Sequence, residues 1–94
     1  MGSLTELSAE VGRVLAAQDF RLATVESCTG GWIGQSLTAV AGSSAWYERG
    51  YVTYSNASKT ELVGVPPELI SRSGAVSEPV VRAMARGALS RTPA

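Results

Sequence analysis

Two short polar segments hold the side chains of this sequence that could carry out chemistry. One is Glu26-Ser-Cys-Thr-Gly-Gly31, which contains a serine beside a cysteine, and the other is Tyr54-Ser-Asn-Ala-Ser-Lys59, which supplies a phenol and an amine. A serine becomes a nucleophile when a neighbouring base takes its proton, and a lysine partly buried near it can serve as that base. The sequence therefore points to Ser27, with Lys59 and Tyr54 as the groups that activate it.

The chain contains no histidine. This absence removes Ser–His and Cys–His catalysis and every histidine-ligated metal site. Acid–base chemistry must then come from lysine, tyrosine, glutamate or aspartate side chains. No cofactor is expected at the site.

Each of these residues also has a plain structural interpretation. The pair Gly30-Gly31 fits a tight turn, but it also fits a backbone that approaches a ligand and leaves N–H groups free at a helix start for a phosphate or an oxyanion. Lys59 could be a solvated side chain in the first turn of a helix, and Tyr54 could simply pack on a sheet. Cys28 is expected to be a small buried hydrophobic side chain.

The composition argues against several classes of partner. The chain has 94 residues, with eight basic and eight acidic side chains and no block of like charge, so neither nucleic acid nor an anionic membrane is expected to bind. No apolar run approaches the roughly 20 residues that span a bilayer. The N-terminus also lacks the basic segment followed by an apolar segment that is typical of a signal peptide. A single cysteine cannot form an intrachain disulfide, which suits a cytoplasmic location.

The hydrophobic pattern predicts the elements that must position the two polar segments. Strands are expected at 20–25 and 45–55, so each polar segment follows a strand, which is where ligands bind in α/β sheets. Helices are expected after a capping box at Ser3–Glu6, over Ile33–Ala41, from Asn56 as N-cap to Gly64, from Pro67 to Gly74, and after Ser77.

This alternation predicts an α/β fold with about two strands and four to five helices, as one domain over residues 1–94. Two strands make a small sheet for so many amphipathic helices. The chain is therefore expected to be part of a larger layered domain.

The longer motifs resemble those of the CinA C-terminal domain family, the nicotinamide-nucleotide amidohydrolases or NMN deamidases. They are ESCTGG, GSSAW, YSN followed by Lys59, and GAVSEPV, and the likeness runs from about Leu7 to Ala88. The resemblance implies a three-layer α/β/α fold without a metal. It also implies hydrolysis of the carboxamide of nicotinamide mononucleotide to nicotinic acid mononucleotide and ammonia.

The same resemblance implies roles for individual residues. Ser27 would be the nucleophile, while Tyr54 and Lys59 would activate it and shuttle protons. The residues implied to line the pyridine-nucleotide pocket are Glu26, Thr29, Gly30, Gly31 and Asn56.

Domains of this family are considerably longer than the present chain, which corresponds to their N-terminal half. Two classes of function are therefore open: an amidase acting on a pyridine nucleotide, or a truncated, inactive homologue that only binds a nucleotide or a partner protein. In either case we expect self-association, or a missing complementary segment, to cover the unfinished sheet.

Overall fold

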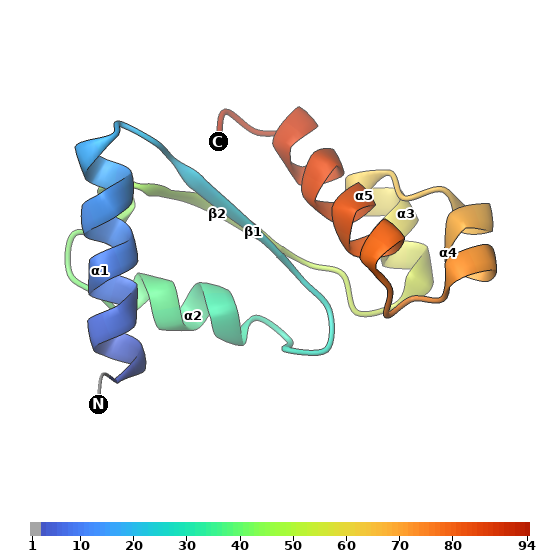
Figure 1. The fold of residues 1–94 in the computed structure, drawn as a ribbon, viewed down its shortest axis with the longest axis horizontal. Helices are drawn as coiled ribbons and strands as arrows, with labels where there is room; N and C mark the ends of the chain where they lie inside the picture. Colours follow the sequence, from blue (N-terminus) through green and yellow to red (C-terminus); the bar gives the residue numbers. More distant parts are fainter. Residues whose placement is uncertain (1–2) are drawn as a thin grey trace.

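The structure, a computed structural model, describes residues 3–94, and its helices and strands alternate along the chain (Figure 1). The elements are α1 (Leu4–Ala17), β1 (Leu22–Glu26), α2 (Trp32–Thr38), a 3-10 turn (Ser43–Ala45), β2 (Tyr47–Val52), α3 (Asn56–Val63), α4 (Pro67–Ser73) and α5 (Glu78–Ser90). Within these residues the fold has two parallel strands and five α-helices, which confirms the α/β class expected from the sequence.

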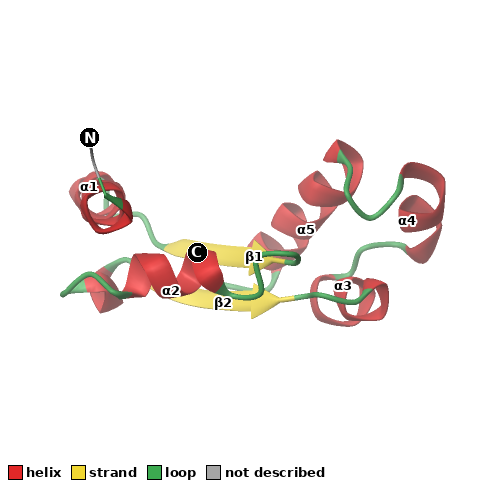
Figure 2. Ribbon diagram, turned by 90° about the horizontal axis from the view of Figure 1, so that it is seen from below, coloured by secondary structure: helices red, strands yellow, loops and turns green. Residues whose placement is uncertain are grey.

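The two strands form the centre of the molecule and have helices on both faces. They pair in parallel, so the carboxyl ends of both strands, Glu26 and Val52, lie together at one edge. Glu26 points toward α2, because its carboxylate accepts a hydrogen bond from the Gly34 amide, whereas the neighbouring Val25 packs against the α3–α5 core. Successive residues of a strand face opposite sides, so α2 and α5 cover opposite faces of the sheet (Figure 2).

The largest apolar core lies between the last three helices and the sheet. It consists of Val63, Val65, Ile70, Val80, Met84 and Ala88, against which Val25 and Tyr51 pack. Helices α3 and α5 approach closely at Gly87, because a Cβ placed there would fall far inside contact distance of the Val63 carbonyl oxygen. This core holds α3 against α5, which in turn packs on β1, and α3 carries Lys59.

A second group of contacts packs α1 against α2, on the other side of the strands from the α3–α5 core (Figure 1). Trp46 is buried against Gly12, where a Cβ would lie 2.5 Å from the indole ring. The expected capping box is confirmed, with Ser3 accepting from the Glu6 amide and Glu6 accepting from the Ser3 amide.

Several apolar residues of the helices are exposed to solvent. On α1 the buried residues are Ser8 and Gly12, whereas Leu7 is 60% exposed, and on α5 Val81 and Leu89 are each 57% exposed. The radius of gyration is 14.1 Å, against roughly 12 Å for a compact domain of this length. A sheet of two strands is too narrow to cover the apolar faces of the helices that lie on its two sides.

Several predicted boundaries also differ from the structure. Strand β1 begins at Leu22 and not at residue 20, and β2 ends at Val52 and not at residue 55. Helix α2 ends at Thr38 and not at Ala41, and the segment after it closes in a 3-10 turn that delays β2 to Tyr47. Ser55, and not Asn56, is the N-cap of α3, because its Oγ accepts a hydrogen bond from the Ser58 amide at 3.0 Å. Sequence spacing alone did not separate two adjacent residues that both cap helices well.

Candidate active site

Ser27 and Lys59 meet where the two strands end. Lys59 Nζ lies 3.1 Å from Ser27 Oγ, within hydrogen-bond distance. Ser27 directly follows β1, and Lys59 lies on the first full turn of α3, which begins just beyond β2. The expectation that these two residues would come within reach of each other is therefore confirmed, while their catalytic roles stay a prediction.

Lys59 is buried without a carboxylate partner. The residue is only 2% exposed, which removes the alternative of a solvated lysine. Its Nζ donates to the backbone carbonyl oxygens of Thr53 at 3.1 Å and Tyr54 at 3.2 Å, in addition to its contact with Ser27. None of the ion pairs found among residues 3–94 includes Lys59. The Lys59 amine can donate two N–H groups to these carbonyl oxygens, which leaves the third substituent position on its nitrogen directed at the Ser27 hydroxyl.

Tyr54 contributes to the site through its main chain. Its carbonyl oxygen accepts from Lys59 and also lies 3.5 Å from Ser27 Oγ, whereas the residue as a whole is 73% exposed. Tyr54 is therefore not packed into the sheet as the structural alternative held. Its phenol has no hydrogen bond within the described part of the chain.

Cys28 is exposed, so its expected burial as a small hydrophobic side chain is wrong. It lies beyond the end of β1, on the loop that turns into α2, and no core packs against that loop position. The alternation of a strand no longer decides which side chains face inward once the strand has ended.

Glu26 is buried, and hydrogen bonds satisfy both of its carboxylate oxygens. Oε1 accepts from Thr29 Oγ1 at 2.7 Å and from the amides of Ile33 at 2.9 Å and Gly31 at 3.2 Å, while Oε2 accepts from the Gly34 amide at 2.8 Å. Burial by itself would raise the pKa of the Glu26 carboxyl, but the four hydrogen bonds, led by that of Gly34, outweigh it and leave the pKa below its usual value.

These contacts correct one expectation about the glycine-containing turn. The amides of Gly31, Ile33 and Gly34 are not free for a phosphate or an oxyanion, because the Glu26 side chain occupies them. The turn still needs glycine, since Gly30 and Gly31 adopt φ of 63° and 105°, a region that side-chain-bearing residues avoid. The hydroxyl of Thr29 is likewise directed to Glu26.

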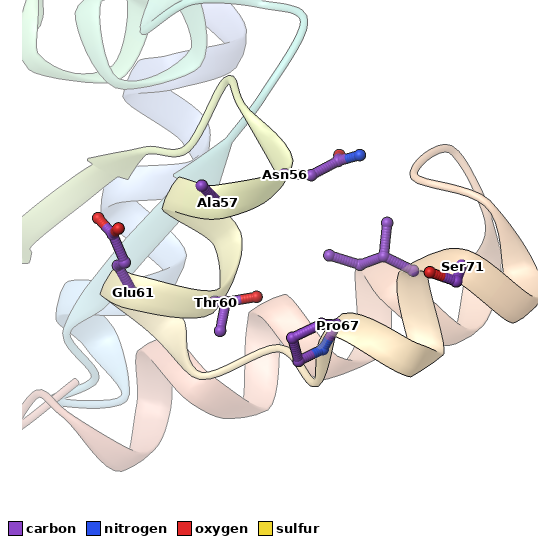
Figure 3. A pocket seen from close by; sticks show the side chains of 7 residues that line it. Asn56, Ala57, Thr60, Glu61, Pro67 and Ser71 are labelled. Carbon is purple, nitrogen blue, oxygen red and sulfur yellow. The ribbon is translucent and has the colours of Figure 1, made fainter.

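Asn56 lies apart from this turn. It lines an open pocket of about 360 Å³ between α3 and α4, together with residues that include Thr60, Pro67 and Ile70 (Figure 3). Thr29, in contrast, borders a mostly apolar groove between α1 and α2. The structure therefore brings together Ser27, Lys59 and the main chain of Tyr54, but gives Asn56 and Thr29 separate surroundings. Their proposed contact with substrate stays a prediction.

Thr53 belongs to the site although the sequence did not indicate it. The residue is fully buried, its amide and hydroxyl donate to the Glu26 carbonyl at 2.7 and 3.2 Å, and its own carbonyl accepts from Lys59. A threonine at the end of a β-branched strand gives no signal of this kind in sequence. The polar segment that the sequence indicates begins at Tyr54, one residue after Thr53.

Each helix described between residues 3 and 94 is too short or too polar to span a membrane. No group of three or more cysteine, aspartate or glutamate side chains there is arranged to hold a metal ion.

The chain belongs to the CinA C-terminal domain family, whose model matches residues 4–94. Among solved structures, a competence/damage-inducible protein from Agrobacterium tumefaciens superposes with a TM-score of 0.95 at 41% identity, over 100% of this chain and 57% of that one. A homologue from Klebsiella pneumoniae gives a TM-score of 0.96 at 41% identity, over 99% of this chain and 58% of that one. The expected fold is thus that of part of a CinA domain.

Several curated relatives of the chain are named as enzymes. The nicotinamide-nucleotide amidohydrolase PncC of Escherichia coli K12 is 55% identical over 92% of this chain and 52% of its own length. The protein of the same name from Pseudomonas putida is 52% identical over 94% of this chain and 55% of its own length. The chain therefore spans about half the length of these relatives.

Proposed function

We propose that Ser27 and Lys59 form the catalytic pair of an amidase that hydrolyses the carboxamide of nicotinamide mononucleotide, giving nicotinic acid mononucleotide and ammonia. The observation that carries the proposal is the 3.1 Å separation of Lys59 Nζ and Ser27 Oγ at the carboxyl ends of the strands. The relationship to amidohydrolases at 55% identity supports the choice of substrate.

The first half of the reaction needs Lys59 as a neutral amine. Two N–H groups of that amine donate to the carbonyls of Thr53 and Tyr54, which aims the nitrogen lone pair at the hydroxyl of Ser27. Lys59 takes the hydroxyl proton while Ser27 Oγ bonds to the carboxamide carbon. The ammonium of Lys59 then returns a proton to the amide nitrogen, and ammonia leaves as the tetrahedral intermediate collapses to an ester.

The second half repeats these steps with water. Lys59 takes a proton from a water molecule, whose oxygen attacks the ester carbon, and the proton returns to Ser27 Oγ as the acid is released. Tyr54 is proposed to shuttle protons between the amine and the leaving group. Its exposed side chain leaves the phenol free to turn toward a bound substrate. Thr29, Gly30, Gly31 and Asn56 are the proposed contacts of the nucleotide. Glu26 is not among them, because both of its carboxylate oxygens already accept hydrogen bonds from the turn itself.

The test is release of ammonia from nicotinamide mononucleotide by the purified 94-residue chain, with the acid product identified by mass spectrometry. A second sample joins the chain to the C-terminal half of a full-length relative, because the chain spans only about half of such proteins. Ser27→Ala in the same background is the matched control. A joined protein that folds, binds the nucleotide and releases no ammonia would disprove the amidase proposal.

The Tyr54 side chain is exposed and makes no hydrogen bond in the described residues, which also fits a second candidate, an inactive homologue that only binds a nucleotide or a partner protein. The two candidates differ in a calorimetric titration run beside the ammonia assay. Binding of nicotinamide mononucleotide without turnover, by both the short and the joined protein, supports the second candidate.

A further inference from the structure

Glu26 is a buried carboxylate that no cation neutralises within residues 3–94. It is 3% exposed, and none of the ion pairs found there includes it. Burying a charge of this kind is unfavourable unless hydrogen bonds compensate for the lost hydration. Here three backbone amides and the Thr29 hydroxyl provide them. A glutamate held in this way replaces the missing side-chain cap of α2, whose N-cap is Gly31.

The main chain of Glu26 is tied to the other half of the site. Its carbonyl oxygen accepts from the amide and the hydroxyl of Thr53, and the carbonyl of Thr53 accepts from Lys59 Nζ. Lys59 in turn reaches Ser27, which is covalently bonded to Glu26. The four residues Glu26, Thr53, Lys59 and Ser27 therefore form a closed ring of contacts.

From this ring we infer that Glu26 is a positioning residue for the catalytic pair and not a contact of the substrate. The Glu26 carboxylate holds the turn that leads from Ser27 into α2. The main-chain carbonyl of Glu26 holds Thr53, and the carbonyl of Thr53 in turn orients the Lys59 amine. The inference rests on the proposed function for the identity of the reaction, but the ring itself does not depend on the substrate. Both carboxylate oxygens are already occupied, which leaves Glu26 little capacity to bind a ligand as well.

The test measures the reactivity of Ser27 directly with a fluorophosphonate probe on the 94-residue chain. The phosphorus bonds to Ser27 Oγ, fluoride leaves with the electrons of the P–F bond, and Lys59 takes the hydroxyl proton. Mass spectrometry gives the site and rate of labelling. All variants are compared at a temperature where circular dichroism shows each of them folded.

Glu26→Gln is expected to lower the labelling rate at least tenfold. The amide keeps the size of the side chain, but its NH₂ group faces an amide that needs an acceptor. Glu68→Gln is the matched control, because Glu68 is also a glutamate near a helix start but is exposed, on α4. It is expected to label at the rate of the unaltered chain. Equal rates for Glu26→Gln and Glu68→Gln would overturn the inference.

A milder pair of variants covers the case in which Glu26→Gln does not fold. Thr29→Val removes one of the four donors to the carboxylate, and Thr29→Ser restores it. Labelling should fall severalfold in the valine variant and recover in the serine variant. No loss in the valine variant, or an equal loss in both, counts against a positioning role.

The outcome is separable from that of the proposed function. If the unaltered chain labels at Ser27, Glu26→Gln does not, and the joined protein releases no ammonia, the positioning role stands and the amidase proposal fails. In an active joined protein, Glu26→Gln should lower kcat and leave KM nearly unchanged. A raised KM with an unchanged kcat would show that Glu26 contacts the substrate, and a folded unaltered chain that never labels would contradict both proposals.

Discussion

Lys59 Nζ and Ser27 Oγ are 3.1 Å apart although 32 positions separate the two residues in the chain. The parallel pairing of β1 and β2 causes this contact, because it places the ends of both strands at one edge of the sheet. The turn after β1 and the first turns of α3 then face each other. A contact that depends on this register is sensitive to small changes at either strand end.

Ser27→Ala is expected to lower turnover of an active form by at least about a thousandfold, since no other nucleophile among residues 3–94 is hydrogen-bonded to Lys59. The free energy of unfolding should change by about 1 kcal/mol or less, because the half-buried hydroxyl loses only its contact with Lys59 and a longer one with the Tyr54 carbonyl. Ammonia release and chemical denaturation measure the two effects. Cys28→Ser is the control and should keep most of the activity, because the Cys28 side chain is exposed to solvent. Activity in Ser27→Ala together with loss in Cys28→Ser would move the nucleophile by one residue.

Lys59→Met is expected to abolish turnover as well, since the sequence has no histidine to replace the base. Lys59→Arg is the matched comparison, because arginine keeps a positive charge but does not give up its proton in proteins. Both variants should be inactive if Lys59 acts as a base. An active arginine variant would instead indicate that the site needs only a positive charge. Ammonia release from a joined, folded protein is the measurement.

Glu26 should make the chain sensitive to acid. Its pKa is lower in the folded chain than in the unfolded one, so the folded chain binds fewer protons there. The resulting stability is complete above the unfolded value of about 4.3 and is lost as the pH falls through the lower folded value. Denaturation curves at a series of pH values should therefore show Glu26→Gln less stable than the unaltered chain near neutrality, with the two converging in acid.

The exposed pairs of Glu10 with Arg13 and Glu48 with Arg49 also hold the pKa of each carboxyl below its usual range, through hydrogen bonds from the arginine. Both pairs are present in both proteins, so the difference between the two curves isolates Glu26. A difference that stays constant from neutral to acid pH would show that ionisation of Glu26 contributes nothing.

Gly87→Ala should destabilise the chain even though alanine is the better helix former. In an ordinary helix interior this change gains about 1 kcal/mol. At position 87 the new methyl group would collide with the backbone of Val63, and overpacking of this kind costs about 1–3 kcal/mol. Thermal or chemical unfolding measures the sign. Ala85→Gly on the exposed side of the same helix is the control and should lose about 1 kcal/mol. A more stable Gly87→Ala variant would mean that α3 and α5 are not in close contact.

The purified chain is expected to self-associate as its concentration rises. Leu7, Trp32, Val81 and Leu89 are each more than half exposed, and they lie on helices at both ends of the molecule. Exposed apolar surface of this kind favours association. Sedimentation velocity over about a hundredfold range of concentration should show a growing average mass, which Leu7→Glu should reduce. A monomer at every concentration would contradict the expectation.

The sequence by itself determined the order of the helices and strands, with their ends displaced by a few residues, and it selected the candidate reacting groups. Capping residues such as Ser3 and positive-φ glycines such as Gly64 act within one or two turns, so their effect can be read locally. The absence of histidine left Lys59 and Tyr54 as the bases available to Ser27, before any geometry was considered.

Tertiary structure alone decided what surrounds those groups. The burial of Lys59, the roles of Thr53 and Glu26 in holding it, and the exposure of Cys28 all depend on how the strand ends face α2 and α3. The same is true of the apolar residues on α1 and α5, whose spacing indicates a buried face that a sheet of two strands does not cover. Hydrophobic periodicity shows which face of an element is apolar, but only packing between distant segments decides whether that face, or a polar group beside it, is removed from water.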